Sequence, residues 1–253
     1  MKESEITKLR EEVVHLLQSQ DIPPARRTGQ RFSPPSVHSK AEMAKLIDHT
    51  LLKPQATPED IENLCQEARR FGFASVCVNP CYIPQCVDSL QRSGVKVCGV
   101  AGFPLGANLP QVKAREAKLA VDQGAQEVDM VMNIGALKSN DLLLLAQDMQ
   151  AVLQATGPGI KVKVIIEAAL LSDEEKVKAC TVAQWVGADF VKTSTGFGPG
   201  GATVADVTLM RRTVGWEMGV KAAGGIRDFP TALQMVEAGA NRIGTSSGVK
   251  IVG

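Results

Sequence analysis

The sequence contains few aromatic residues, and its charges almost cancel. Aromatic side chains make up 4% of the 253 residues, and 28 Lys and Arg face 27 Asp and Glu, which leaves a net charge of +1. The chain therefore lacks base-stacking material and a bulk positive charge, which argues against nucleic acid or an acidic membrane as a partner. A local anion site remains open, because it needs only a few groups.

A signal peptide, a membrane-spanning run and a C-x-x-C pair are also missing. The first eight residues contain four charged side chains in place of an apolar signal core. The cysteines have no zinc-type spacing, and several lie in apolar runs where cysteine behaves as a small hydrophobe. They are Cys65, Cys77, Cys81, Cys86, Cys98 and Cys180. We expect reduced thiols in a soluble, cytoplasmic protein with no membrane partner.

Residues 1–40 differ in character from the rest of the chain. Apolar residues recur at helical spacing over residues 4–18, which predicts an amphipathic helix. Residues 21–40 contain four prolines among Arg, Ser and Gly and are read as a linker or extended arm. Such a helix packs on its own domain or on a partner subunit, and together with the arm it suggests a homodimer. We therefore divide the chain into an extension, 1–40, and a catalytic domain, 41–253.

From residue 41 onward, short apolar strands alternate with helical stretches. The predicted strands are residues 46–51, 75–79, 96–102, 127–133, 162–168, 190–195, 220–223 and 242–246, and the predicted helices are 58–71, 84–92, 111–123, 140–156, 173–186, 204–214 and 229–238. Strict alternation predicts a parallel sheet, and eight strands favour a closed (β/α)8 TIM barrel with its last helix reduced to 249–252. The rival, an open doubly wound sheet, is weakened because no G-x-G-x-x-G turn follows the first strand.

Two of these strands contain a lysine within an apolar run. Lys192 lies in Phe-Val-Lys-Thr-Ser-Thr-Gly, and Lys221 lies in Gly-Val-Lys-Ala-Ala-Gly-Gly. A lysine with its head in water would explain either one alone. If the two strands are neighbours, however, the two ammonium groups lie close together in a low-dielectric site, and one of them can lose its proton and become a nucleophile. The pair therefore predicts Schiff-base chemistry on a carbonyl substrate.

Further polar residues lie near the carboxyl ends of other strands, where the active site of such a barrel is found. Asp48, Thr50 and Cys77 come from the first two strands, Asp129 from the fourth, and Lys163 and Glu167 from the fifth. Alternation places Lys163 and Glu167 on one face. For these two, a satisfied polar core and a catalytic role fit equally well. For Asp129 we favour a functional role.

Metal chemistry has little support in these residues. His49 is the only histidine of the barrel, and transition-metal sites in barrels usually draw on imidazoles. A magnesium site built from carboxylates stays open. A nucleophile pair of Cys77 and His49 is geometrically conceivable, but its spacing does not argue for it.

Glycines and serines at the last strand ends predict a phosphate site. They are Gly196, Gly224, Gly225, Ser246 and Ser247. Exposed backbone N–H groups and serine hydroxyls can hold a dianion without much basic charge, and the loops after strands seven and eight are the common phosphate site of this fold. Taken singly, each glycine needs only to form a tight turn. Taken together beside two lysines, they favour a phosphate.

These motifs resemble the deoxyribose-phosphate aldolase family, in the family's order and over residues 46–252. The resemblance rests on Leu46-Ile47-Asp48-His49-Thr50-Leu51-Leu52, Val76-Cys77-Val78-Asn79-Pro80, Val128-Asp129-Met130-Val131-Met132-Asn133, Lys192-Thr193-Ser194-Thr195-Gly196-Phe197 and Val220-Lys221-Ala222-Ala223-Gly224-Gly225-Ile226-Arg227. It implies a class I aldolase that needs no metal or other cofactor. The reaction implied is the reversible cleavage of 2-deoxy-D-ribose 5-phosphate to D-glyceraldehyde 3-phosphate and acetaldehyde.

The resemblance also implies roles for individual residues. Lys192 would form the imine, Lys221 would keep Lys192 deprotonated, and Asp129 would transfer protons through a bound water. Asp48 and Lys163 would complete the charge network, with Thr50 and Cys77 in support. Gly196, Gly224, Gly225, Ser246 and Ser247 would bind the substrate's phosphate.

The chain departs from some members of the family in two places. Phe197 stands where some members have a lysine beside the phosphate, and Arg227 could compensate for the absent cation. Some members end in a tyrosine that assists proton transfer, whereas this chain ends at Gly253 and its only tyrosine is Tyr82. We therefore expect a mechanism without a tyrosine.

Two other functions compete with the aldolase. An isomerase or epimerase would use Asp129 and Asp48 as acid and base, with Lys192 as an electrostatic clamp. A non-catalytic barrel would bind a sugar phosphate without turnover, although a mere binder gains nothing from two buried lysines. Trapping of an imine separates the aldolase from both.

Overall fold

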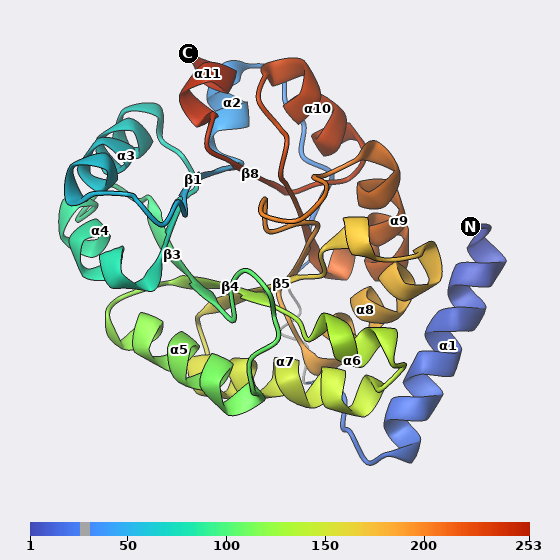
Figure 1. The fold of residues 1–253 in the computed structure, drawn as a ribbon. Coiled ribbons are helices and arrows are strands. Elements are labelled where there is room, and N and C mark those ends of the chain that lie inside the picture. Colours follow the sequence, from blue (N-terminus) through green and yellow to red (C-terminus); the bar gives the residue numbers. More distant parts are fainter. Residues whose placement is uncertain (26–30) are drawn as a thin grey trace.

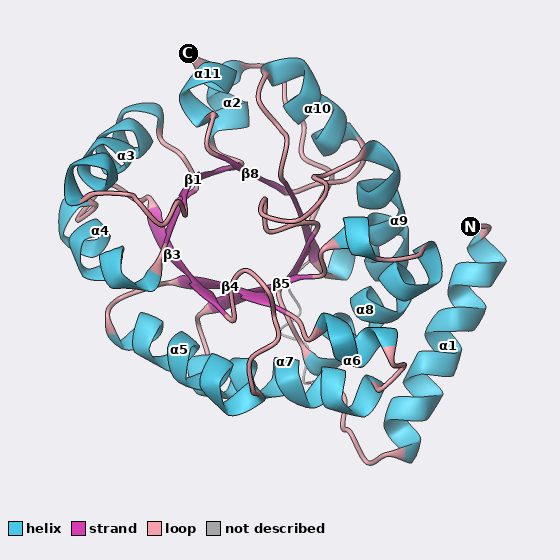
Figure 2. Ribbon diagram, viewed as in Figure 1, coloured by secondary structure: helices cyan, strands magenta, loops and turns pink. Residues whose placement is uncertain are grey.

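Eight parallel strands close into a barrel in the order β1 to β8 in a computed structural model that describes residues 1–25 and 31–253. Figure 2 shows the strands as a closed ring. The strands are β1 (Ile47–Leu51), β2 (Ser75–Val78), β3 (Lys96–Ala101), β4 (Glu127–Val131), β5 (Lys161–Ile165), β6 (Phe190–Lys192), β7 (Gly219–Ala223) and β8 (Arg242–Thr245). The predicted TIM barrel is confirmed.

Helices surround this barrel on the outside (Figure 1). They are α2 (Lys40–Ala44), α3 (Pro58–Phe71), α4 (Ile83–Ser89), α5 (Pro110–Asp122), α6 (Ile134–Lys138), α7 (Leu142–Thr156), α8 (Asp173–Val186), α9 (Val204–Val214), α10 (Phe229–Glu237) and α11 (Gly248–Val252), with the short 3-10 turns η1 (Pro80–Tyr82), η2 (Ala168–Leu170) and η3 (Gly215–Glu217). The reduced last helix, α11, is confirmed. Helices α2 and α6 and the three short turns were not predicted.

Local capping signals define several helix ends. Thr57 and Asp60 form a capping box at the start of α3, with Pro58 in the first turn, and left-handed Gly72 ends the helix. Ser172 and Glu175 form the same box at the start of α8. These reciprocal hydrogen bonds satisfy backbone donors that have no partner inside a helix. They explain why the predicted bounds of α3 and α8 are confirmed.

Several strands end earlier than predicted, at the carboxyl edge of the barrel. Strand β4 ends at Val131, because Asn133 leaves the ladder and accepts a hydrogen bond from the Ala136 amide at 3.0 Å as the N-cap of α6. Strand β6 ends at Lys192, so Thr195 belongs to a loop. At this edge the side chains are placed by caps and turns, which strand alternation does not describe.

The extension packs against its own barrel. Helix α1 (Glu3–Ser19) lies outside the ring along α8, as seen in Figure 1, and buries Ile6 against Val177 and Leu209. At its amino end, Arg212 donates to Glu3 at 2.8 Å. The proposed division between extension and barrel stays a prediction, and residues 26–30 of the predicted arm lie outside the described residues.

The arm reaches the amino-terminal end of the barrel. The Trp185 indole donates to the Ile22 carbonyl at 3.0 Å, and the Phe32 amide donates to the Trp216 carbonyl at 2.7 Å. The Phe32 ring meets the Phe190 ring edge-on, with centroids 5.0 Å apart. Phe190 begins β6 two residues before Lys192, so the arm supports the strand that ends in the lysine.

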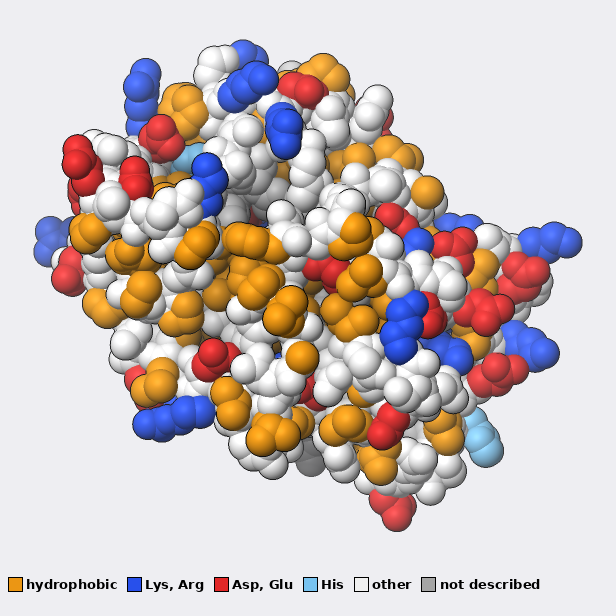
Figure 3. All heavy atoms as spheres, in the orientation of Figure 1, with side chains coloured by type: hydrophobic (Ala, Val, Ile, Leu, Met, Phe, Trp, Pro, Cys, Tyr) orange, Lys and Arg blue, Asp and Glu red, His pale blue; other side chains and the backbone are white. Residues whose placement is uncertain are grey.

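The surface has one further feature near the barrel mouth. Figure 3 shows apolar side chains gathered around the centre of the ring and over neighbouring helices. Large exposed apolar residues include Leu105, Leu109, Val112 and Phe197.

Within residues 1–25 and 31–253, none of the helices has the length and apolar character needed to cross a bilayer.

Candidate active site

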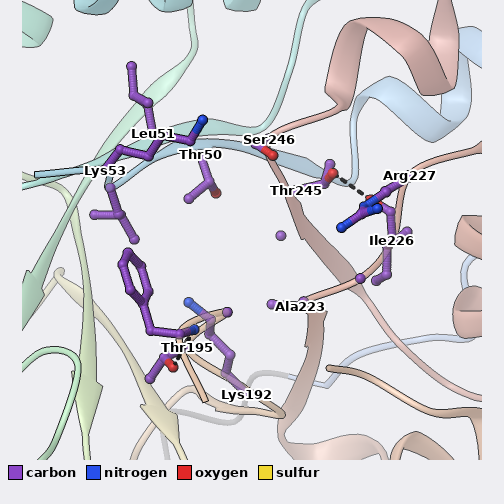
Figure 4. A pocket seen from close by; sticks show the side chains of 16 residues that line it. Thr50, Leu51, Lys53, Lys192, Thr195, Ala223, Ile226, Arg227, Thr245 and Ser246 are labelled. Atoms are coloured by element: carbon purple, nitrogen blue, oxygen red, sulfur yellow. Dashed lines mark hydrogen bonds between the residues drawn. The ribbon is translucent and has the colours of Figure 1, made fainter. Parts of the chain in front are cut away.

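A cavity of about 330 Å³ opens where β1, β6, β7 and β8 end. Its lining includes Thr50, Leu51, Leu52, Lys53, Lys192, Thr195, Gly196, Phe197, Ala223, Gly224, Gly225, Ile226, Arg227, Gly244, Thr245 and Ser246. Figure 4 shows Lys192 and Arg227 approaching this space from different sides. The cavity therefore lies at the strand ends that the sequence indicated.

Lys192 and Lys221 are opposite each other on β6 and β7, as predicted. Their ammonium groups are bridged by a carboxylate, because both donate to Oδ2 of Asp129, at 2.8 and 2.7 Å. The side chain of Lys192 is 3% exposed and lines the cavity, whereas Lys221 and Asp129 are fully buried beneath it. The structure thus brings the three predicted catalytic residues together and gives the cavity access to one of the two lysines.

The other oxygen of Asp129 belongs to a second group of contacts. Lys163 donates to Asp129 Oδ1 at 2.8 Å and pairs with Glu127 Oε2 at 2.6 Å. The Cys98 thiol also lies 3.2 Å from Asp129 Oδ1. Lys163 is fully buried and does not line the cavity, so its position is one of support for Asp129.

Asp48 joins this network from the opposite side of the barrel. Its Oδ2 pairs with Lys221 at 2.6 Å, and its Oδ1 accepts hydrogen bonds from Ser75 at 2.7 Å and from Nε of Arg242 at 2.7 Å. Arg242 also pairs with Glu127 at 3.0 Å. Through Arg242 the contacts form a closed circuit across the barrel interior.

The electrostatic surroundings keep most of these groups ionised at neutral pH. Burial alone would raise the pKa of Asp129, but Lys163, Lys192 and Lys221 hold it well below its usual range. Burial alone would lower the pKa of Lys221, but Asp129 and Asp48 raise it above its usual value. The pKa of Lys163 is raised for the same reason, chiefly by Asp129. Each charge is stable because an opposite charge faces it.

The network contains one more cation than carboxylates. The cations are Lys163, Lys192, Lys221 and Arg242, and the carboxylates are Asp48, Glu127 and Asp129. Lys192 pairs with one of these carboxylates, whereas Lys163 and Lys221 each pair with two. If every group were ionised, the excess would be one positive charge.

Glu167 does not belong to this network, and the expectation that it shares an interior strand face with Lys163 is wrong. Strand β5 ends at Ile165, and Glu167 has a left-handed backbone with φ +52°. Its carboxylate accepts hydrogen bonds from the amide and the hydroxyl of Thr195. The glutamate that pairs with Lys163 is Glu127, on β4.

The predicted phosphate residues line the same cavity, with one exception. Gly196, Gly224, Gly225 and Ser246 are part of the lining, whereas Ser247 is not and precedes α11. Within the described residues, the amides of Gly196, Gly225 and Ser246 have no hydrogen-bond partner. Unpaired N–H groups on residues that line one cavity can form a concave donor surface, which suits an anion.

Two cationic side chains also line this cavity. Lys53 and Arg227 are both exposed, and in the described part of the chain neither forms an ion pair. Phe197 lies on the lining with 52% exposure, its ring edge-on to Phe103 at 5.4 Å. Arg227, which we predicted as a replacement for the absent lysine, therefore lines the cavity.

The remaining predicted residues have more limited positions. Thr50 lines the cavity, and its hydroxyl donates to the carbonyl of Asp48, two residues earlier, at 2.9 Å. Nε2 of His49 lies 2.6 Å from Glu67, so the structure pairs His49 with Glu67 and not with Cys77. Ligating atoms of Cys77, Cys98 and Asp129 lie within 4.8 Å of one another, but both Asp129 oxygens are taken by lysines. Ammonium groups at this distance make the cluster a poor fit for a metal cation.

Sequence reasoning missed Glu127, Arg242 and Ser75. The signal for Glu127 was present, because it precedes Asp129 by two residues and alternation places both on one strand face. Arg242 and Ser75 had no such signal. Their role depends on closure of the barrel, which places β8 beside β1 and β1 beside β2.

Comparison with known proteins places this chain in a family. Residues 42–252 match the family described as DeoC/LacD family aldolase. The chain belongs to this family. Relatives named deoxyribose-phosphate aldolase from Clostridium tetani and Lysinibacillus sphaericus are 59% and 61% identical to it over 211 and 209 residues. Each match covers 83% of this chain, with 98% and 94% of the respective relative.

Solved structures agree with this assignment. A putative deoxyribose-phosphate aldolase from Coccidioides immitis is 39% identical with a TM-score of 0.85, and the match covers 96% of both chains. A deoxyribose phosphate aldolase from Aeropyrum pernix, described as having a unique tetrameric structure, is 38% identical with a TM-score of 0.80, over 85% of this chain and 92% of its own. The Coccidioides structure thus extends the similarity into the first 40 residues, which the family match does not include.

Proposed function

We propose that this protein is a class I deoxyribose-phosphate aldolase. It would reversibly cleave 2-deoxy-D-ribose 5-phosphate to D-glyceraldehyde 3-phosphate and acetaldehyde. The observation that supports this best is the position of Lys192, whose amine reaches the cavity while the buried carboxylate behind it also holds Lys221. An amine in this position can form a covalent imine with a sugar aldehyde.

The charge count favours Lys192 as the amine that becomes neutral. Loss of one proton balances the four cations against the three carboxylates. Lys192 can lose it with the smallest loss of ion pairs, because Asp129 keeps both Lys163 and Lys221. Lys221 must stay charged, since it lies between Asp48 and Asp129 at 2.6 and 2.7 Å. This asymmetry separates the nucleophile from its neighbour.

In the proposed reaction, Nζ of Lys192 adds to the C1 aldehyde of the open-chain sugar, and loss of water gives a protonated imine. The C3 hydroxyl then loses its proton and the C2–C3 bond breaks, with its electron pair moving to C2 to form an enamine. D-Glyceraldehyde 3-phosphate leaves. Protonation of C2 and hydrolysis of the imine release acetaldehyde and restore Lys192.

Asp129 would move protons in this sequence while Lys221 and Lys163 hold it in place. Its Oδ2 lies 2.8 Å from the Lys192 amine and can accept the proton that the amine must lose. Because Asp129 is fully buried, transfer between it and the substrate would pass through water in the cavity. Asp48, Glu127 and Arg242 would keep Lys221 and Lys163 oriented.

The phosphate of the substrate would bind at the far side of the cavity. The free amides of Gly196, Gly225 and Ser246 would donate to it, with Gly224 shaping the turn. Arg227 and Lys53 would supply the positive charge that Phe197 lacks. A site with both backbone donors and two cations accommodates a dianion.

The remaining parts of the proposal concern cofactors, location and assembly. The reaction needs no metal or organic cofactor, because the protonated imine is itself the electron sink. We propose a cytoplasmic enzyme that forms a homodimer, and the exposed Leu105, Leu109 and Val112 offer apolar surface for such contact. Sedimentation of the protein at several concentrations tests the dimer.

Borohydride reduction in the presence of acetaldehyde tests the chemistry. We expect a two-carbon adduct on Lys192 in the intact mass and peptide map, together with cleavage of deoxyribose 5-phosphate. A folded protein that gives neither adduct nor cleavage contradicts the aldolase and would direct attention to isomerase assays. An adduct on Lys221 would keep the reaction and exchange the two lysines.

A further inference from the structure

Glu167 is a buried carboxylate that the proposed mechanism does not use. Its residue is 3% exposed, and no cationic side chain of residues 1–25 and 31–253 pairs with it. Among the described residues its Oε1 has no hydrogen-bond partner, and its backbone is left-handed at φ +52° and ψ +61°. A buried carboxyl group without a cationic partner and a left-handed non-glycine residue are both costly, and such features persist where the surroundings impose them.

The contacts of Glu167 hold one turn of the cavity wall. Its Oε2 accepts hydrogen bonds from the Thr195 amide at 3.1 Å and from the Thr195 hydroxyl at 2.5 Å. Because that hydroxyl donates its proton to Glu167, its lone pairs are free to accept the Phe197 amide at 3.0 Å. The amides on both sides of Gly196 are therefore engaged within the turn, and the Gly196 amide remains free at the cavity.

The backbone around Glu167 is itself anchored beside β6. The Ile166 amide donates to the Lys192 carbonyl at 3.0 Å, and the Ala168 amide donates to the Thr193 carbonyl at 2.8 Å. The turn also packs closely on the carboxylate, because a Cβ on Gly198 would lie 2.9 Å from Cδ and Oε1 of Glu167. Glu167 thus connects the end of the strand that bears Lys192 to the turn that bears Gly196.

We infer that Glu167 is a positioning residue for recognition of the substrate's phosphate, acting through Thr195 to hold the Gly196 amide toward the cavity. The inference rests on the proposed function. A carboxylate close to a phosphate repels it, so any benefit of Glu167 must come from the geometry that it imposes. Its loss should therefore weaken binding of phosphorylated ligands and leave the imine chemistry of Lys192 in place.

A comparison of two substrates separates this role from general structural support. Steady-state rates of Glu167→Gln and Glu167→Ala are measured with 2-deoxyribose 5-phosphate and with unphosphorylated 2-deoxyribose. We expect kcat/KM for the phosphorylated sugar to fall about tenfold in Glu167→Gln and about a hundredfold in Glu167→Ala, mainly through KM. We expect less than about a threefold change with the unphosphorylated sugar.

Matched variants guard against an effect of charge or folding alone. Glu174→Gln removes the same charge from an exposed position in the first turn of α8 and should leave both rates unchanged. Thr195→Val, which removes the hydroxyl, should reproduce the selective loss. Thr195→Ser keeps the hydroxyl and should retain the wild-type rate with the phosphorylated sugar. If the Glu167 variants do not fold, the Thr195 pair decides.

Inorganic phosphate gives a readout that does not depend on turnover. Its dissociation constant, measured by phosphorus NMR titration, should rise in the Glu167 variants in the same order as KM. Equal losses with both sugars, or unchanged phosphate affinity in the Glu167 and Thr195→Val variants, would overturn the inference. If the wild type cleaves neither sugar, the proposed aldolase fails, while the phosphate titration still decides whether Glu167 positions an anion site.

Discussion

Lys192 and Lys221 donate to the same carboxylate oxygen, Oδ2 of Asp129, from opposite positions on adjacent strands. Lys221 has a second partner in Asp48 at 2.6 Å, whereas Lys192 has no second carboxylate among its pairs in the described residues. Two lysines with similar sequence surroundings therefore have different electrostatic positions. The difference supports one as the nucleophile and the other as a fixed charge.

Replacing Lys192 by Arg should abolish the chemistry without unfolding the protein. Arginine keeps a positive charge near Asp129 but cannot form the imine. We expect no borohydride-trapped adduct and a fall in kcat on the order of 10⁴-fold. The exposed Lys250→Arg is the matched control and should behave as wild type. Retained trapping in Lys192→Arg would show that another amine is the nucleophile.

Replacing Lys221 by Met should reduce imine formation. Asp129 would then keep only Lys192 and Lys163 as cationic partners, so its ion pair with Lys192 becomes more favourable and the amine is less available to a substrate. We expect the yield of adduct trapped with acetaldehyde at pH 7 to fall about tenfold or more in Lys221→Met. An undiminished yield would contradict the role given to Lys221.

Replacing Arg242 by Met should destabilise the barrel. The change leaves Asp48 and Glu127 without a shared cation in the interior, and such losses typically cost about 3–5 kcal/mol of the free energy of unfolding. Urea titration measures this cost. Adding Glu127→Gln should recover part of it, because one stranded charge is removed. Simple addition of the two single costs would argue against coupling through Arg242.

Acid should destabilise the protein through the same carboxylates. Neighbouring cations hold the pKa values of Asp48, Glu127 and Asp129 below their usual range, against the effect of burial. The folded state therefore binds protons more weakly than the unfolded chain, whose carboxyl groups titrate near pH 4. We expect the contribution of these carboxyls to the free energy of unfolding to be fully present above about pH 4. It should be lost progressively as the pH falls below that value.

Urea titrations between pH 7 and pH 2 check this dependence, and Asp48→Asn should show a weaker one. Burial raises the pKa values of Asp148 and Asp189, so these two groups contribute in the opposite direction, but the three lowered carboxyls outnumber them. A free energy of unfolding that stays level, or increases, as the pH falls below 4 would show that the network is not ionised in the way described.

Replacing Phe32 by Ala should weaken the amino-terminal end of the barrel. The ring is half-buried against Phe190, and loss of an aromatic pair together with partial burial costs about 1–2 kcal/mol. Phe32→Leu keeps apolar volume and should cost less. The free energy of unfolding in urea provides the comparison. Equal stability of the wild type, Phe32→Ala and Phe32→Leu would mean that the arm contacts the barrel without stabilising it.

Much of the fold could be predicted because its signals are local. Thr57 with Asp60 and Ser172 with Glu175 begin helices by contacts three residues apart, and Gly72 and Gly187 end them. Repetition of strand and helix then leaves a parallel barrel as the natural closure. The confirmed barrel and aldolase family follow from this repetition and from the motifs at its strand ends.

The charge network shows what local signals leave out. Asp48, Glu127 and Arg242 lie on β1, β4 and β8, and Arg242 joins the two carboxylates across the barrel interior. Nothing within a window of the sequence relates residues 48, 127 and 242. Glu167 is a similar case, because a left-handed turn removes it from the alternation that would have placed it beside Lys163.

The sequence by itself determined the repeat, the apolar strands and the two lysines within them, because periodicity and burial act between near neighbours. Tertiary structure alone decided that Asp129 bridges Lys192 and Lys221, that Arg242 completes the network, and that Lys192 is the lysine at the cavity. The physical reason is that charges pair through space. Only closure of the barrel sets which buried cation faces which carboxylate, and which one remains within reach of a substrate.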